Sequence, residues 1–205
     1  MVANRLLDTA IDHFGRLGFE GASTRAIAQA SGTAMSSITY HFGGKEGLYL
    51  AAADRIVEVI TESQAEALAA IGARRIDTRD DAVEALLDLF DSFAVMMLSE
   101  ESALPARFII REQMEPTAAF DRIWNGLMQR MSDVFLSLLA RIRDDLDEDA
   151  RRATGILAFG QAIALRAARA SISRVLGVEA LGPSETELLR ARLRQNALAI
   201  LEYRQ

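Results

Sequence analysis

Apolar residues recur at intervals of three and four along almost the whole chain, and this spacing limits the fold more than any other feature. It is the spacing of one face of an α-helix, whereas the alternating pattern of a half-buried strand is missing. Only three of the 205 residues are proline, so few positions interrupt a helical segment. Half of the residues are hydrophobic, which is enough to enclose a core. The sequence therefore predicts an all-α protein.

The first 45 residues predict three short helices. The first carries an apolar stripe, Leu7, Ala10, Ile11, Phe14 and Leu17. We expect it to end at Gly18, because glycine readily takes a left-handed conformation. Ser23 is the expected cap of a second helix that runs to Ala30, and a third covers about residues 34–40. Two short helices joined by the turn Ser31-Gly32-Thr33 form a helix-turn-helix.

Longer helices are expected from Lys45 onward. Their predicted ranges are 45–71, 79–98, a short helix from Pro105 to about Met114, 116–143, 148–176 and 184–204. Ser184 and Glu187 have the spacing of a capping box at the start of the last one. The chain is therefore expected to contain an N-terminal helix-turn-helix domain, residues 1–45, and a larger helical domain, residues 46–205.

Composition and spacing argue against several classes of protein. The absence of cysteine excludes a disulfide scaffold, a thiolate metal site and a cysteine nucleophile. No signal peptide and no apolar run of membrane-spanning length is recognisable, so we expect a cytoplasmic protein without membrane contact. The two histidines lack a carboxylate cluster at ligand spacing, and Asp145–Asp149 lacks the glycine and glutamate of a calcium loop. We therefore expect no metal, no cofactor and no enzymatic activity.

One motif carries a family likeness. Residues 18–48, GFEGASTRAIAQASGTAMSSITYHFGGKEGL, resemble the DNA-binding domain of the TetR family of bacterial transcriptional regulators. The matching features are the Gly-Phe pair, the Ser-Thr-Arg start of the second helix, the glycine turn, and Tyr-His-Phe followed by Lys-Glu-Gly-Leu. Residues 106–123, ARFIIREQMEPTAAFDRI, are similar to the C-terminal domain of the CecR-type subgroup. The resemblance implies a homodimeric repressor of a palindromic operator, released by a small-molecule inducer.

The third helix and its flanks hold the candidate DNA contacts. A helix that enters the major groove needs small and polar side chains at its start, and residues 34–37 supply them. Lys45, the only lysine, is expected at a helix N-terminus, where backbone N–H groups also favour a phosphate. The resemblance implies that Arg25 contacts a phosphate or a guanine, the alternative being a solvated side chain. The candidates are Ser23, Thr24, Arg25, Met35, Ser36, Ser37, Thr39, Tyr40, His41 and Lys45.

Further expectations concern the same region. Thr33 is expected to cap the third helix, and the Tyr40 ring to pack on the domain while its phenol reaches a phosphate. Arg5 is expected in a short arm before the first helix. Met35 stands where the family often has lysine, and the basic and acidic residues of the first 46 positions balance. Because few phosphates would be neutralised, the salt dependence of DNA binding should be shallow.

The larger domain has two candidate sites, both implied by the resemblance. An apolar inducer pocket would be lined by Phe90, Phe93, Met97, Arg107, Arg111, Met114, Phe120, Trp124 and Met128, although each apolar member alone is typical of a core. Arg107, Arg111 and Glu112 either face solvent, or pair with each other or with an anionic ligand. A four-helix bundle across a twofold axis would use Gly160, Ala164, Ala167, Ala168, Ser171, Leu189, Leu193, Ala197 and Ile200.

Two other functions stay open at this point. The neutral N-terminal region and Met35 would also fit a ligand-binding protein whose DNA-binding helices no longer read DNA. No arrangement of residues in the sequence supports an enzyme.

Overall fold

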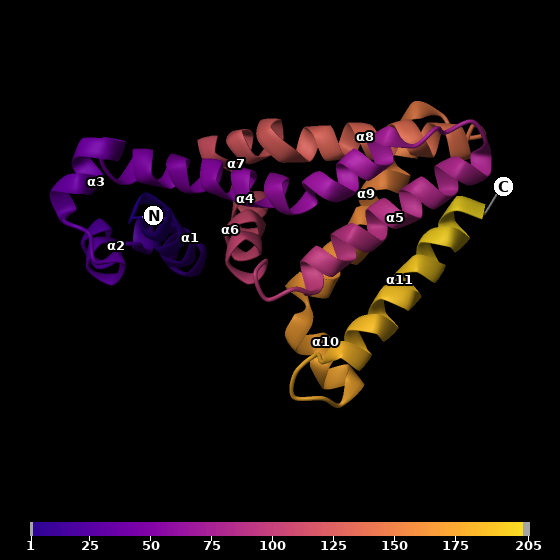
Figure 1. Ribbon diagram of the computed structural model, residues 1–205. Helices are drawn as coiled ribbons and strands as arrows, with labels where there is room; N and C mark the ends of the chain where they lie inside the picture. The colour runs from indigo at the N-terminus through magenta and orange to yellow at the C-terminus, as the bar shows by residue number, and fades with distance from the viewer. Residues whose placement is uncertain (1, 203–205) are drawn as a thin grey trace. The chain divides into compact units, whose positions relative to one another are not determined.

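The computed structural model describes residues 2–202, and in this range it contains helices and no strand (Figure 1). The prediction of an all-α protein is confirmed. The elements are α1 (Val2–Gly21), α2 (Thr24–Ser31), α3 (Met35–Phe42), α4 (Lys45–Ala73), α5 (Arg79–Leu98), α6 (Ala103–Met114), α7 (Ala118–Ile123), the π-helical turn η1 (Trp124–Met128), α8 (Gln129–Ile142), α9 (Glu148–Ala167), α10 (Arg169–Leu176) and α11 (Pro183–Glu202). None of these helices is both long and apolar enough to cross a membrane.

Glycine and a serine cap set the ends of the N-terminal helices. Ser23 Oγ accepts a hydrogen bond from the Ala26 N–H, so Ser23 caps α2 as predicted. Gly32 and Gly43 end α2 and α3 with φ of 66° and 72°. The first helix breaks at Gly18, the residue predicted to end it, where φ is 75°, and a short helical segment to Gly21 follows the break.

Two predicted long helices are interrupted in the structure. Residues 116–143 form α7, η1 and α8, and residues 148–176 form α9 and α10 with a break at Ala168, whose φ and ψ are −103° and 19°. Within the π turn, a Cβ on Gly126 would lie 2.8 Å from Val57 Cγ1 on α4. The two segments therefore approach so closely that a side chain at position 126 would collide with Val57. An apolar period of three and four does not reveal one extra residue in a turn.

The start of the last helix also differs from the prediction. α11 begins at Pro183, and the N–H of Gly182 donates to a Glu185 carboxylate oxygen at 2.9 Å. Proline suits the first helical position because the N–H that it lacks would have no partner there. The predicted capping box of Ser184 and Glu187 is therefore wrong by two residues. The final positions of that predicted helix, 203 and 204, lie outside the described residues.

The helices divide into two compact units. Unit 1 contains the residues up to Ser63 together with Ala103–Arg130, and unit 2 contains Gln64–Ser102 together with the residues from Met131 onward. α4 is one continuous helix through residues 45 and 46, where the sequence places a domain boundary. Unit 1 therefore adds α6, α7 and part of α4 to the three N-terminal helices. That residues 1–45 act alone as the DNA-binding domain stays a prediction.

The core of unit 1 is aromatic. The Phe14 ring on α1 meets the Tyr49 ring on α4 at 4.8 Å, and Tyr49 meets Phe108 on α6 at the same centroid distance. Ile27 and Ile38, which are buried, hold α2 and α3 on this core. Burial of each such side chain contributes about 1.5–3 kcal/mol. The packing fixes the direction in which the outer faces of α2 and α3 point.

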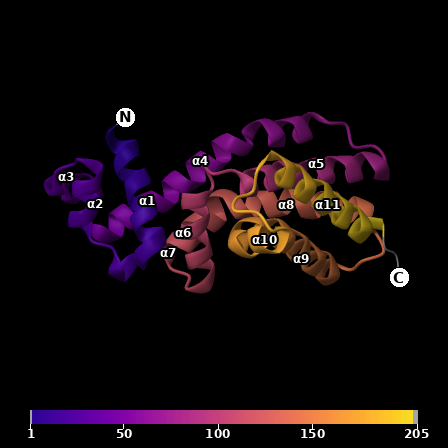
Figure 2. The same ribbon diagram turned by 90° about the horizontal axis from the view of Figure 1, so that it is seen from below.

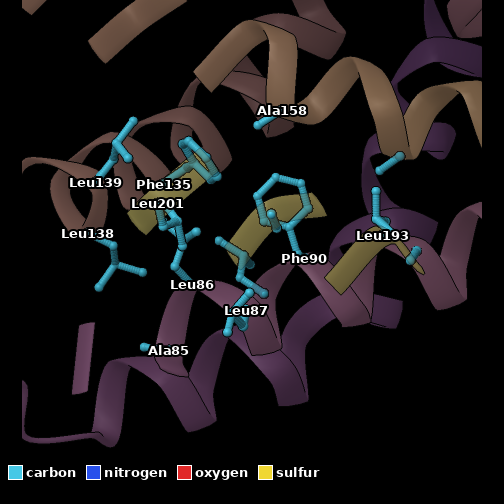
Figure 3. Close-up of a cluster of buried hydrophobic side chains, with 14 of the residues drawn as sticks. Ala85, Leu86, Leu87, Phe90, Phe135, Leu138, Leu139, Ala158, Leu193 and Leu201 are labelled. Atoms are coloured by element: carbon cyan, nitrogen blue, oxygen red, sulfur yellow. The ribbon is translucent and has the colours of Figure 1, made fainter. Parts of the chain in front are cut away.

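The core of unit 2 lies between α5, α8, α9 and α11, which Figures 1 and 2 show close together. Phe135 packs against Phe90 at 5.4 Å and Phe159 at 4.7 Å, with leucines from α5, α8 and α11 around them (Figure 3). Arg143 is buried and makes two 2.7 Å hydrogen bonds to the Asp145 carboxylate, which raise the pKa of its guanidinium. Unit 2 therefore has its own core.

Candidate nucleic-acid interface

The outer face of α3 is a row of exposed side chains. Ile38 is buried and anchors the helix, whereas Met35, Ser36, Thr39 and Tyr40 are exposed. Residues four apart lie on the same side of a helix, so Met35 lies beside Thr39 and Ser36 beside Tyr40. The structure thus brings together four of the predicted DNA contacts on one surface.

The start of α3 has no side-chain cap. Its N-cap is Ala34, and the backbone N–H of Thr33 donates to Ala28 O at 2.8 Å, which completes the end of α2. Thr33 Oγ1 is buried without a hydrogen-bond partner among the described residues, so the expected Thr33 cap is wrong. The first N–H groups of α3 are left to solvent or to a bound anion.

Tyr40 projects away from the domain. Its side chain is 85% exposed and touches only the neighbouring His41 ring, edge-on at 4.9 Å, among the ring contacts of the described residues. The expectation that the ring packs on the domain is therefore wrong. Position 40 lies on the opposite side of α3 from the buried Ile38, so the whole side chain is available to a partner.

Lys45 is held in place at the start of α4. Its ammonium donates to Glu20 O at 3.1 Å and lies 4.8 Å from the centre of the Phe19 ring. Both residues are at the end of α1, so the side chain links α4 to α1. An ammonium has three donors, so donors remain for a second partner. The contact of Lys45 with a phosphate stays a prediction.

The other basic residues of unit 1 differ in their partners. Arg5 lies inside α1 and not in an arm, which corrects the expectation, and its guanidinium is 3.0 Å from the point where a Cβ on Gly32 would stand. Within the described residues, Arg5, Arg25 and Lys45 form no ion pair. By contrast, four arginines of unit 1 are paired with carboxylates: Arg16, Arg55, Arg107 and Arg122. Arg111 on α6 and Arg130 at the start of α8 also form no ion pair within the described residues. Of the unpaired cations of unit 1, Arg5, Arg25 and Lys45 belong to the four N-terminal helices.

A buried polar cluster joins α4, α6 and the residue before α7. Glu112 on α6 is 1% exposed, and one of its carboxylate oxygens accepts a 2.5 Å hydrogen bond from the Tyr49 hydroxyl. The other oxygen accepts from the Thr117 N–H and hydroxyl at 3.0 and 2.9 Å. Burial, and then the neighbouring Glu112 carboxylate, raise the pKa of the Tyr49 phenol well above its ordinary value. Sequence reasoning missed Tyr49 because Glu112 is 63 positions away. It missed Thr117 because a separation of five residues across the end of a helix is not a spacing that pairs side chains by itself.

The surroundings of Arg107, Arg111 and Glu112 on α6 show whether these charged side chains face solvent or have partners. Arg107 is half exposed and lies 3.7 Å from Asp12, and the Arg111 guanidinium lies against Gly18. Glu112 pairs with neither arginine. A carboxylate buried in this way requires several donors, and the tyrosine and the threonine supply them.

The predicted inducer-pocket residues fall in both units. Phe90 and Met97 are buried in the core of unit 2 and Phe93 packs against it, whereas the other six belong to unit 1. Met114 and Trp124 are 78% and 42% exposed. Phe90 and Met97 thus fill the core of unit 2, and a pocket formed by all nine stays a prediction.

The predicted dimer residues also separate into two groups. Leu193 and Ala197 are in the core of unit 2, with Leu189 packed against it, so these side chains face inward. Gly160, Ala164 and Ala167 are exposed on one stripe of α9. Ile156 and Leu157, each 72% exposed, extend this stripe, and Leu188 on α11 is 46% exposed. Sequence reasoning missed the exposed Ile156, Leu157 and Leu188. That the nine residues form a dimer interface stays a prediction.

Two family descriptions match the chain. "Bacterial regulatory proteins, tetR family" covers residues 6–52, and "HTH-type transcriptional dual regulator CecR, C-terminal domain" covers residues 82–203. This chain belongs to the TetR family. The resemblance found in residues 18–48 and 106–123 is confirmed, and the protein is a DNA-binding transcriptional regulator. Among residues 2–202, no group of His, Asp and Glu could hold a metal ion.

Other TetR-family proteins resemble it over different lengths. The dual regulator CecR of Shigella flexneri is 29% identical over 90% of this chain and 84% of its own. The regulatory protein RaaS of Mycobacterium tuberculosis is 47% identical, but over only 31% of this chain and 30% of its own. The regulator FadR of Bacillus subtilis, solved with stearoyl-CoA, has a TM-score of 0.66 at 13% identity and covers 98% of both chains. That last likeness concerns the fold.

Proposed function

We propose that this TetR-family regulator binds a palindromic operator in the cytoplasm as a homodimer, represses transcription, and leaves the DNA when a small molecule binds. The observation that carries the proposal is the exposed face of α3 with the unpaired Arg5, Arg25 and Lys45 around it. A polar helix face flanked by free cations matches a major groove between two phosphate backbones. Four other arginines of unit 1, Arg16, Arg55, Arg107 and Arg122, are paired with carboxylates.

The exposed stripe of α9 supports the homodimer. Gly160 has no atom within 4 Å of the position of an added Cβ, so its side of α9 is open. Small residues let a second helix approach closely, and Ile156, Leu157 and Leu188 add apolar area that a partner would cover. A twofold-symmetric pair would present two α3 helices to half-sites about 34 Å apart.

The buried cluster around Glu112 supports release by a ligand. Its hydrogen bonds tie α6 and the residue before α7 to α4. The first residue of α4, Lys45, comes shortly after α3 and is hydrogen-bonded to the end of α1. A molecule that displaces α6 or α7 would therefore pull on α4 and shift α3. FadR of Bacillus subtilis was solved with stearoyl-CoA, which makes acyl thioesters a first class to test.

Selection of bound fragments from genomic DNA, followed by affinity measurements across a salt series, tests the DNA function. We expect a palindrome, and weaker binding after Arg25→Ala or Lys45→Ala. Arg16→Ala is the matched control, because Arg16 already faces Asp12 and its loss should change affinity little. A palindrome whose affinity survives the double substitution of Arg25 and Lys45 would contradict the site. Absence of any specific DNA, with or without ligand, would favour a protein that binds only a ligand.

Sedimentation tests the homodimer, and reporter assays test whether the protein represses transcription. Gly160→Arg should produce a monomer that loses the palindrome, while Ala140→Arg, on an exposed position of α8, should stay dimeric. The name of the CecR relative, a dual regulator, raises the alternative that some operators are activated. A promoter fusion that falls when the gene is deleted would establish activation at that operator. Dimers cross-linked at their DNA-bound spacing should no longer respond to ligand.

A further inference from the structure

The recognition surface of α3 lacks the side chains that usually read purines. The helix sequence is MSSITYHF, with no Arg, Lys, Asn or Gln. These four side chains make the bidentate hydrogen bonds that identify guanine and adenine in the major groove. Ser36 and Thr39 can each contribute a hydroxyl, but a hydroxyl bonds to several bases and discriminates poorly. Most of the sequence selectivity of this face must therefore come from another kind of contact.

Met35 is the apolar group on that face. It is the first residue of α3, the end that enters the groove in this motif, and its side chain is 45% exposed. Its thioether cannot donate to a phosphate. Met35 lies one turn before the buried Ile38 on a neighbouring side of the helix, yet nearly half of its side chain stays exposed. The Thr39 methyl lies one turn further along the same side. An apolar patch thus lies at the start of α3, on a surface that DNA would cover.

Only one base carries an apolar group into the major groove. The C5-methyl of thymine projects there, whereas the other base edges present donors and acceptors. We infer that α3 recognises thymine C5-methyl groups, with the Met35 thioether as the main contact and the Thr39 methyl beside it. The inference rests on the proposed function, because α3 must enter the major groove. It makes Met35 the specificity-determining residue of each half-site.

The size of the effect follows from the area of one methyl group. Removal of a buried methyl from a contact of this kind should weaken binding about fourfold. A homodimer makes the contact in both half-sites, so the symmetric loss should be about fifteenfold. Loss of a phosphate contact, such as the one predicted for Lys45, should weaken binding to all sequences alike. The two effects are therefore distinguishable in one assay.

The experiment replaces each thymine of the selected operator by deoxyuridine, which removes the C5-methyl and keeps the base pair. Affinity is measured by fluorescence anisotropy for wild type, Met35→Ala, Met35→Leu and Met35→Gln. We expect one or two thymines per half-site to show the loss with wild type and with Met35→Leu. The same thymines should show no loss with Met35→Ala or Met35→Gln. Deoxyuridine in the central spacer and the Lys45→Ala variant are the controls, and thermal unfolding checks that each variant folds.

Each other outcome contradicts the inference. If no deoxyuridine within the half-sites weakens binding, or if Met35→Ala keeps the wild-type sensitivity, Met35 does not read thymine. A selected half-site without thymine under α3 would overturn the inference in the same way, while the DNA-binding function would stand. If no specific DNA is selected under any condition, the proposed function fails, and the reading of thymine falls with it.

Discussion

Replacement of Tyr49 by phenylalanine removes one hydroxyl from the buried cluster and leaves its packing in place. The Tyr49 ring contacts Phe14 and Phe108 at 4.8 Å and Phe19 at 5.1 Å, and a phenylalanine ring keeps these contacts. The Glu112 carboxylate loses its 2.5 Å hydrogen bond and retains only the two donors of Thr117. A hydrogen bond to a buried charged group contributes about 1.5–3 kcal/mol, and this is the expected loss in the free energy of unfolding.

Urea denaturation followed by circular dichroism at pH 7 measures this loss. For a chain of 205 residues, the same change lowers the melting temperature by about 3–12 °C. Tyr40→Phe is the matched control, because the Tyr40 side chain is 85% exposed and its change should stay within about 0.5 kcal/mol.

Alkaline pH provides a second test of the same hydrogen bond. Burial raises the pKa of the Tyr49 phenol, so the folded protein keeps this proton at a pH at which the unfolded chain releases it. The ordinary tyrosine pKa is about 10, so the contribution of Tyr49 is complete below that pH and decreases as pH rises above it. The difference in stability between wild type and Tyr49→Phe should therefore shrink above pH of about 10. A difference below about 0.5 kcal/mol at pH 7, or one that grows in alkali, would refute the assignment of the hydroxyl as donor to Glu112.

Three further substitutions have expected outcomes that calorimetry or urea denaturation can check. Arg190 makes two hydrogen bonds, of 2.9 and 2.6 Å, to the Asp91 carboxylate, so Arg190→Ala should cost about 1–2 kcal/mol, and Arg190→Lys should recover only part of it. Gly126→Ala places a Cβ 2.8 Å from Val57 Cγ1 and should cost about 1–3 kcal/mol, most of which Val57→Ala should relieve in the double variant. Gly32→Ala forces φ of 66° on a residue with a side chain, and should cost about 1 kcal/mol and weaken DNA binding. An unchanged stability for any of the three would contradict the corresponding contact.

Residues close together in the sequence were sufficient to predict most of the local structure. The bounds of α5 agree with the prediction, and the cap at Ser23 and the glycine that ends α2 lie where they were expected. These features depend on hydrogen bonds within one turn, so the residue types at neighbouring positions determine them. The motif over residues 18–48 identified the family for the same reason. The residue types of this motif determine the local backbone conformation and the exposed surface of the helix-turn-helix, and both depend on about thirty consecutive residues.

The tertiary structure decided which side chains of each helix are free. Leu193 and Ala197 have the spacing of an interface, but the neighbouring helices of unit 2 cover them and leave Ile156 and Leu157 outside. A helical period shows that a face is apolar, and it does not show what covers that face. Sequence alone therefore could not separate the side of α11 that packs inside unit 2 from the side that stays exposed.

Contacts between distant residues were beyond the sequence altogether. Tyr49 and Glu112 are 63 positions apart, and no local pattern pairs them. Arg5 reaches the turn at Gly32 only because α1 and α2 pack together. The sequence determined the helical class, several helix ends such as those of α2 and α5, and the family, since these depend on interactions along the chain. The exposed face of α3, its unpaired cations and the buried Glu112 cluster depend on packing across the chain, and only the folded structure established them.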